Sequence, residues 1–286
     1  MKAIAGELPA RFGLPLSRFS RAEWRRHIIA AGIVAEMSGV TIWRWLREDA
    51  IRPWSHRSWI FPRDPDFAVK AGPVLDLYHH RWHGQLLGPR DFGLSADEKT
   101  QIQLITPRER IVPPTADRAM RVSSDYRRHG TCAYLAAWDV HRAKLFGRVV
   151  AQISIVAFDA LVASVMARAP YRTARRVFWV VDNGTIHRGP AAAARLRARW
   201  PNLILVPLPV HASWLNHVEI YFSILQRKAL TPPDFATEDA AAQRILGFQR
   251  HYQAVAHPFE WRFTRRDLAR LLARCSCPTR LTRMAA

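Results

Sequence analysis

The first fifty residues space their apolar and polar side chains as short α-helices do. Ser20 and Glu23 have the pattern of a capping box, in which each side chain bonds a backbone N–H that the first helical turn leaves free. This pattern predicts a helix over residues 21–31. Gly32 should end it, because glycine adopts the left-handed conformation that closes many helices.

Ser38 is the expected N-cap of a second helix, over residues 40–49. Its apolar side chains recur at i, i+3 and i+4 and should face inward: Ile42, Trp45 and Leu46. Its polar side chains should face outward: Thr41, Arg44, Arg47 and Glu48. Two short helices around a tight turn are typical of a helix-turn-helix, whose last helix enters a DNA major groove. A plain helical hairpin with a solvated face is the alternative.

A proline-rich stretch follows the two helices. Prolines block a helix within residues 51–66, so we expect a linker, drawn over residues 53–90. Tryptophans and arginines are interleaved in and beside it: Arg52, Trp54, Arg57, Trp59 and Arg63. These side chains would either follow a phosphate backbone or pin the linker to the next domain through its tryptophans.

From residue 90 the pattern changes to strands and helices. Strands are expected over residues 92–97, 131–140, 144–150, 176–182 and 203–207, and helices over 155–167, 190–200 and 214–230. The order of three strands followed by alternating helices and strands predicts an α/β fold, a mixed sheet flanked by helices.

We therefore divide the chain into four parts. Residues 1–52 form the helix-turn-helix domain, 53–90 the linker, 91–235 the α/β domain and 236–286 a basic C-terminal helical extension. The last 27 residues carry seven arginines and two acidic residues, which supports a basic helix at that end.

The charge of the chain is strongly positive. Lys and Arg number 43 against 23 Asp and Glu, a formal net charge of +20, and 38 of the 43 are arginine. Arginine binds phosphate groups bidentately, and such a surplus repels itself unless a polyanion shares it. Nucleic acid is the leading partner. An arginine-biased genome would explain the ratio of Arg to Lys but not the excess of positive charge.

The cysteines and the hydropathy of the chain indicate the cellular compartment and exclude a membrane span. Cys132, Cys275 and Cys277 are neither a disulfide framework nor a zinc set, which indicates a reducing, intracellular environment. The start of the chain has no secretory signal pattern. The most apolar stretch, residues 149–167, contains Asp159, and an aspartate within a membrane span costs roughly 2.5–3.5 kcal/mol. We expect a soluble protein with no membrane partner.

Three carboxylates stand out by their positions. Asp97 ends the first expected strand, Asp182 ends the central buried strand, and Glu219 lies on the helix that follows the last strand. Two carboxylates about 4 Å apart repel by ~4 kcal/mol at an effective dielectric constant of 20, so a converging set requires cations. Oxygen ligands favour Mg²⁺ or Mn²⁺ over zinc, and two such ions support in-line phosphodiester displacement. A helix cap or a surface ion pair is the alternative role for any single one of them.

Several motifs resemble those of the DDE transposases, in particular the insertion-sequence branch related to mariner elements. The motifs occupy residues 95–103, 128–131, 180–187, 209–219 and 258–264. Asp182 and Glu219 are separated by 36 residues, close to the spacing of that branch. The similarity extends over roughly residues 20–275, and the combination of motifs is specific where a lone Asp-Asn-Gly would not be.

This resemblance implies an RNase H-like catalytic core that cleaves and transfers DNA strands at the ends of a mobile element. It implies that Asp97, Asp182 and Glu219 bind Mg²⁺ or Mn²⁺, with two ions expected. Supporting positions follow from the same motifs: Asn183, His187 and Asn216, with a structural hydrogen bond as the alternative for His187. Glu98 would replace Asp97 if the strand register slipped by one residue. Contacts to DNA are expected from one group of side chains: Trp43, Arg44, Arg47, Arg52 and Arg57.

The implied partners are double-stranded DNA, as terminal inverted repeats and target, and a second copy of the chain in the DNA complex. The implied setting is the bacterial cytoplasm, in association with the nucleoid. The family commonly carries two helix-turn-helix units, whereas only ~60 residues precede the core here. A truncated, catalytically silent copy that occupies or represses element ends is therefore the alternative function.

Overall fold

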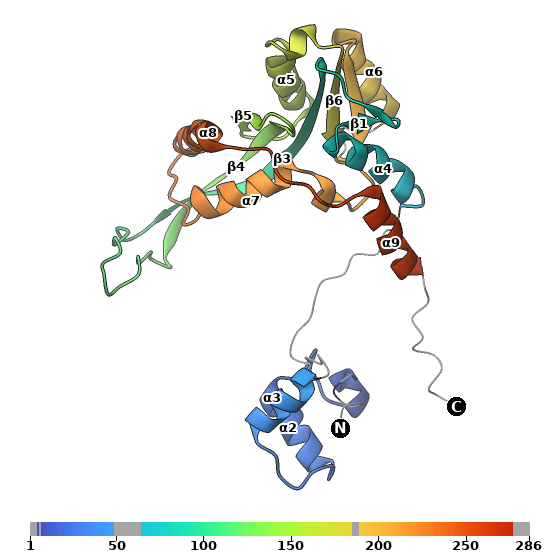
Figure 1. Ribbon diagram of the computed structural model, residues 1–286. Helices are drawn as coiled ribbons and strands as arrows, with labels where there is room; N and C mark the ends of the chain where they lie inside the picture. The colour runs from blue at the N-terminus through green and yellow to red at the C-terminus, as the bar shows by residue number, and fades with distance from the viewer. Residues whose placement is uncertain (1–4, 6, 49–63, 185–188, 277–286) are drawn as a thin grey trace. The chain divides into compact units, whose positions relative to one another are not determined.

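The computed structural model describes residues 5, 7–48, 64–184 and 189–276 (Figure 1). The chain divides into two compact units, Met1–Ile60 and Phe61–Ala286. Within the described residues, no helix is long and apolar enough to cross a membrane.

The first unit consists of η1 (Pro9–Phe12), α2 (Arg21–Ala30) and α3 (Gly39–Glu48). The capping box is confirmed, because the backbone N–H of Glu23 donates to Ser20 Oγ at 3.2 Å and that of Ser20 donates to the Glu23 carboxylate at 2.7 Å. Gly32 has a φ of 67°, the left-handed conformation expected beyond the helix end.

The α3 helix places its side chains as the periodicity predicts. Ser38 Oγ accepts from the N–H of Thr41 at 3.0 Å, and Ile42 and Leu46 are fully buried against α2. Trp43 is 38% exposed, and the guanidinium of Arg47 lies 4.9 Å from the centre of its ring. The outward face thus carries an aromatic ring and two arginines, since Arg44 is exposed as well.

The second unit is built on a five-stranded mixed sheet in the order β5-β4-β3-β6-β7. Its strands are β3 (Asp91–Pro107), β4 (Tyr126–Asp139), β5 (Lys144–Val150), β6 (Arg176–Val181) and β7 (Leu203–Pro207). The β3-β4 and β4-β5 pairs are antiparallel, whereas β3, β6 and β7 run parallel. This is the predicted mixed α/β sheet.

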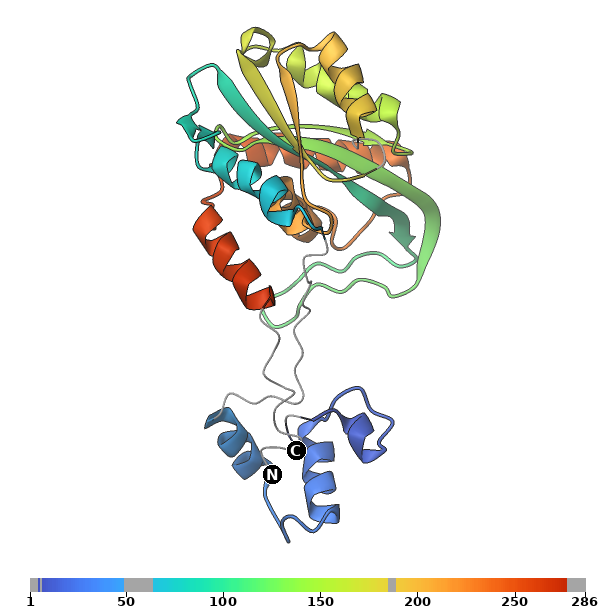
Figure 2. The ribbon, with the colours of Figure 1, turned by 90° about the vertical axis from the view of Figure 1, so that its right-hand side faces the viewer.

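Helices cover both faces of the sheet (Figures 1 and 2). Two helices pack on one face, α5 (Ile155–Met166) and α6 (Gly189–Arg199), while four contribute to the core on the other: α4 (Phe67–Tyr78), α7 (Val218–Lys228), α8 (Glu238–Val255) and α9 (Arg265–Ser276). Successive residues of β6 alternate between the two cores, with Trp179 facing α5 and Phe178 and Val180 facing the other layer. Short elements complete the unit: β1 (Arg81–Trp82), β2 (Gln85–Leu86), η2 (Tyr171–Thr173) and η3 (Ser213–Leu215).

Two parts of the predicted organisation need correction. Residues 67–78 of the expected linker form α4, because their apolar side chains recur at helical spacing and pack in the core of the second unit: Phe67, Ala71, Val74, Leu75 and Tyr78. The C-terminal extension is likewise part of this unit, since Ala241, Ile245 and Leu268 belong to the same core.

The position of Asp97 also differs from the prediction. Asp97 lies inside β3 and does not end it, because β4 continues the antiparallel ladder as far as Pro107 opposite Tyr126. The parallel pairing with β6 ends earlier, at Ser95. Asp97 is therefore the point where β3 leaves β6.

Asp91 anchors the beginning of β3. Its side chain is fully buried and accepts bidentate hydrogen bonds from Arg175 and Arg176, at 2.6–3.1 Å, and one from the N–H of Gly88 at 3.0 Å. Burial raises the pKa of Asp91, but the bonds from Arg176, Arg175 and Gly88 outweigh it and hold the pKa well below its ordinary value.

We expect Asp91→Asn to destabilise the protein by about 2 kcal/mol at pH 7, because both guanidinium groups lose a charged acceptor. A carboxyl whose pKa is lowered on folding adds stability above its unfolded pKa, about 4, and loses it as the pH falls towards the folded pKa. Urea unfolding should thus show the whole difference in the free energy of unfolding between wild type and variant at pH 7, and a smaller difference below pH ~4. An equal difference at pH 7 and pH 3 would contradict this account of Asp91.

Candidate active site

Two neighbouring parallel strands carry the first two carboxylates. β3 and β6 are paired up to Ser95 opposite Val180, and Asp97 and Asp182 each follow that pair by two residues. Equal offsets along parallel strands place residues at the same level of the sheet. The strand register therefore brings Asp97 and Asp182 together, although they are far apart in the sequence.

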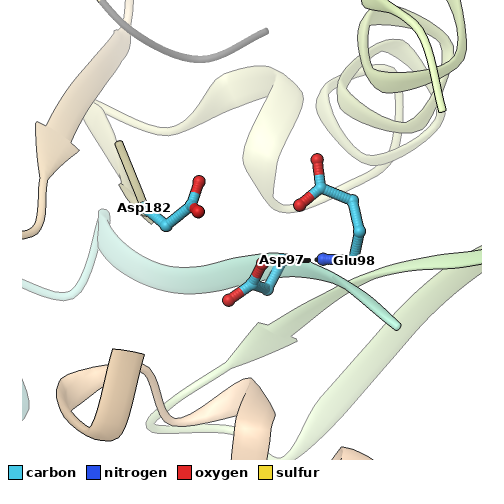
Figure 3. Close-up of side chains that lie close together, drawn as sticks. All are labelled: Asp97, Glu98 and Asp182. Carbon is cyan, nitrogen blue, oxygen red and sulfur yellow. Dashed lines mark hydrogen bonds between the residues drawn. The ribbon is translucent and has the colours of Figure 1, made fainter. Parts of the chain in front are cut away.

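Glu98 joins them. Asp97, Glu98 and Asp182 each offer a carboxylate oxygen such that the three atoms lie within 4.8 Å of one another; we call this group the carboxylate cluster (Figure 3). Neighbouring residues on a strand point to opposite faces, and Figure 3 shows Asp97 and Glu98 leaving β3 on opposite sides. Both carboxylates belong to the cluster, so the choice of Asp97 over Glu98 as the metal ligand stays a prediction.

Asp97 is held by hydrogen bonds on both oxygens. Oδ1 accepts from the N–H of Glu98 at 2.8 Å, and Oδ2 accepts from Nδ2 of Asn216 at 2.8 Å. Asn216, which is 1% exposed, also donates to the carbonyl of Ala96 at 3.1 Å. A buried amide thus fixes the direction of the Asp97 carboxylate.

Ser95 extends this contact to the next helix. Its hydroxyl donates to Oδ1 of Asn216 and accepts from the N–H of Val218 at 3.0 Å. Val218 is the first residue of α7, where backbone N–H groups have no partner within the helix. The Ser95 hydroxyl therefore ties the start of α7 to the strand that carries Asp97.

Glu219 lies in the first turn of α7 and is half-buried. It is not part of the carboxylate cluster, but it is electrostatically linked to it. Burial and the charge of Asp97 raise the pKa of Glu219; Lys99 opposes this shift and Asp182 adds to it. Glu219 thus faces the same negative charge from the side of α7.

The cluster disfavours its fully charged form. Burial raises the pKa of Asp97 and the charge of Asp182 adds to this, while hydrogen bonds from the backbone of Glu98 and from Asn216 oppose the shift without cancelling it. Burial and the neighbouring Asp97 raise the pKa of Glu98 to about 8. A divalent cation bound by carboxylates in this state would stabilise their charged forms and screen the repulsion between them.

The donor set fits a hard cation. Within the described residues, this is the one group of three or more His, Cys, Asp or Glu side chains placed to hold a metal, and all its donors are carboxylate oxygens. Mg²⁺ and Mn²⁺ prefer such ligands.

The remaining predicted residues fall in different places. Asn183 donates through Nδ2 to the carbonyl of Leu208 and so joins the ends of β6 and β7. Trp43, Arg44 and Arg47 lie on α3, in the first unit. Three predicted residues lie outside the described residues: Arg52, Arg57 and His187.

The sequence did not single out the residues that hold the turn before α7. The hydroxyl of Tyr78, on α4, donates to the carbonyl of Leu215 at 2.7 Å, and its ring stacks on His217 with centroids 3.8 Å apart. His217 also packs against Trp261, with ring centroids 4.7 Å apart, and the rings of Tyr78 and Trp261 lie 5.5 Å from each other. Burial lowers the pKa of His217 to about 3, so its ring is neutral at pH 7. The helical spacing of the apolar residues around Tyr78 is the signal that could have identified α4.

Comparisons with known proteins agree with this geometry. A family model described as "DDE superfamily endonuclease" matches residues 94–240, just over half of the chain. That segment contains Asp97, Glu98, Asp182 and Glu219. No curated protein matches the chain by sequence.

Two solved structures of the Mos1 mariner transposase are similar in fold. They are a paired-end complex with Mn and a paired-end complex with the left transposon end, each 14% identical to this chain, with a TM-score of 0.51. Each alignment covers 92% of this chain and 78% of the Mos1 chain. At this identity the likeness establishes the fold, and the predicted RNase H-like architecture is confirmed. Together with the family match, it leads to one conclusion: the chain belongs to the DDE superfamily of endonucleases.

Proposed function

We propose that this protein is a transposase that binds the ends of its mobile element and cleaves and transfers DNA strands with divalent metal ions. The observation that carries the proposal is the convergence of Asp97 and Asp182, by strand register, inside the segment that matches the endonuclease family. Asp97, Asp182 and Glu219 are the proposed metal ligands, and Glu98 lies close enough to share the site.

The proposed cofactor is Mg²⁺ or Mn²⁺, with two ions. Bound ions of this kind activate a water or a 3′-hydroxyl and stabilise the leaving oxygen of a phosphodiester. Asn216 orients the Asp97 carboxylate through Oδ2, and Ser95 fixes the first turn of α7 and with it Glu219. The charge of Lys99 opposes the upward shift in the pKa of Glu219 and so partly favours its charged form.

The proposed partner is double-stranded DNA, as terminal inverted repeats and as target. The net charge of +20 supports a polyanion, and the exposed α3 face offers Arg44 and Arg47 to a major groove. The similar Mos1 structures are paired-end complexes, and we propose by analogy that two copies of this chain pair two DNA ends. An insertion sequence in a bacterial cell, with the protein on the nucleoid, is the proposed setting.

We expect metal-dependent nicking of a labelled duplex that carries the DNA flanking this gene, with Mn²⁺ or Mg²⁺ but not with EDTA. Asp97→Ala and Asp182→Asn should each lower the nicking rate by at least about a hundredfold, because each removes a ligand from the cation. Asp159→Asn is the control, since Asp159 pairs with Arg195 on the surface of α5. Nicking that survives Asp182→Asn would end the three-carboxylate mechanism, and binding without cleavage in any metal would favour the silent copy.

Asn216→Ala should weaken Mn²⁺ binding about ten- to hundredfold, because the Asp97 carboxylate loses the amide that orients it. The readout is the concentration of Mn²⁺ that raises the thermal unfolding midpoint, which reports binding without turnover. Asn202→Ala is the matched control: its amide also donates to backbone carbonyls, those of Tyr171 and Ala174. It should lower the midpoint without shifting the Mn²⁺ dependence. Equal Mn²⁺ dependence in both variants would contradict the orienting role of Asn216.

Arg44→Ala should weaken binding to the flanking DNA by about tenfold or more, since the α3 face loses a contact to the groove. Arg26→Ala is the control, because Arg26 is an exposed arginine of the same unit on α2. Fluorescence anisotropy with both variants at one salt concentration measures the difference. If the two lose affinity equally, α3 is not a recognition helix.

A further inference from the structure

A groove between β5 and α8 lies at one edge of the second unit. It encloses about 430 Å³. Three basic side chains line it, Lys144, Arg168 and Arg250, and its other side chains are neutral: Leu145, Phe146, Gln249, Gln253 and Ala254. No carboxylate belongs to the lining that the structure describes.

The wall of the groove is fixed by hydrogen bonds between α8 and the outer edge of the sheet. The N–H of Leu145 donates to Oε1 of Gln253 at 3.2 Å, and Nε2 of Gln249 donates to the carbonyl of Leu145 at 3.2 Å. The hydroxyl of Tyr134 holds Gln249 from the neighbouring strand at 2.8 Å. β5 is the edge strand, and α8 covers part of its free backbone in this way.

The three cations are exposed and lack acidic partners. Among the ion pairs of the described residues, none involves Lys144, Arg168 or Arg250. The guanidinium of Arg168 lies 5.7 Å from the centre of the Phe146 ring, which restricts its orientation. Three like charges around one groove repel each other, so binding an anion there relieves the repulsion.

The groove is separate from the carboxylates. Lys144 is paired with Asp139, and Asp139 with Leu94, three residues before Asp97. This separation amounts to about 10 Å across two strands and about 10 Å along the strand direction. Figure 1 shows α8 and β5 on the far side of β4 and β3 from β6. One phosphate group therefore cannot contact both places.

We propose that this groove binds the sugar-phosphate backbone of DNA at a second point, away from the carboxylates. The inference rests on the proposed function for the identity of the polyanion. Arginine and lysine around a groove without carboxylates suit phosphate groups, and contacts of this kind position a duplex without reading its sequence. The second unit then holds DNA by itself, in addition to the contacts proposed for α3.

The test is the salt dependence of DNA binding by the full chain in EDTA. Each phosphate contact contributes about 0.9 to the slope of log K against log salt concentration. The triple variant Lys144→Ala, Arg168→Ala, Arg250→Ala should bind a labelled 30-base-pair duplex of arbitrary sequence more weakly, with a slope shallower by up to about 3. Fluorescence anisotropy at several NaCl concentrations measures both quantities.

Two control variants separate the groove from net charge. Arg197→Ala, Arg199→Ala, Arg266→Ala removes three exposed arginines outside the groove and should leave most of the slope unchanged. Lys144→Arg, Arg168→Lys, Arg250→Lys keeps the charges in the groove and should restore the wild-type slope. Circular dichroism and the thermal midpoint verify that each variant is folded.

The outcomes distinguish the two proposals. If the alanine variant of the groove and the Arg197, Arg199 and Arg266 control variant show the same slope of log K against log salt concentration, the proposed DNA groove is wrong. It is also wrong if the groove residues are needed to bind poly-glutamate but not to bind duplex DNA. Groove-dependent duplex binding without nicking in any metal would support the groove and refute the proposed transposase activity.

Discussion

The buried contact of Ser95, Asn216 and Asp97 is the interaction on which the candidate active site depends. It joins a strand to a helix through two side chains with almost no exposed surface, where an unpaired polar group would cost about 1–3 kcal/mol. The polar atoms of this contact all have partners only when the start of α7 lies beside Ser95 and Asp97 of β3. The contact therefore selects one position of α7 relative to β3. That position decides where Glu219 lies relative to the carboxylate cluster.

Acidic and basic side chains are distributed differently over the molecule. The chain carries a net charge of +20, yet three acidic side chains are gathered where β3 and β6 diverge. The raised pKa values of Asp97 and Glu98 record a free energy cost that a divalent cation would offset. Among the described residues, basic side chains such as Arg44, Lys144 and Arg250 are exposed, where water screens them until a polyanion binds. The two features are complementary, since one suits a metal ion and the other the phosphates around it.

The turn before α7 depends on segments far from it in the sequence. Tyr78 on α4 and Trp261 near the C-terminus both pack against His217 and against each other, and both lie outside the segment that matches the endonuclease family. The family segment therefore supplies the carboxylates, while α4 and the residues around Trp261 complete the packing that holds Glu219 in place. This is why the expected linker and extension are better described as parts of one folded unit.

The sequence by itself indicated the elements whose signals are local: the capping box at Ser20, the apolar spacing of α3 and the continuous apolar run of β6. It also identified Asp97, Asp182 and Glu219 as candidates through their motifs. It did not determine the length of β3, the membership of Glu98 in the cluster, the packing of α4 or the role of Ser95. Each of these depends on strand register and on contacts between residues that are 19 to 189 positions apart in the sequence. Only the tertiary structure decides such contacts, because burial and hydrogen-bond partners exist only once the chain is folded.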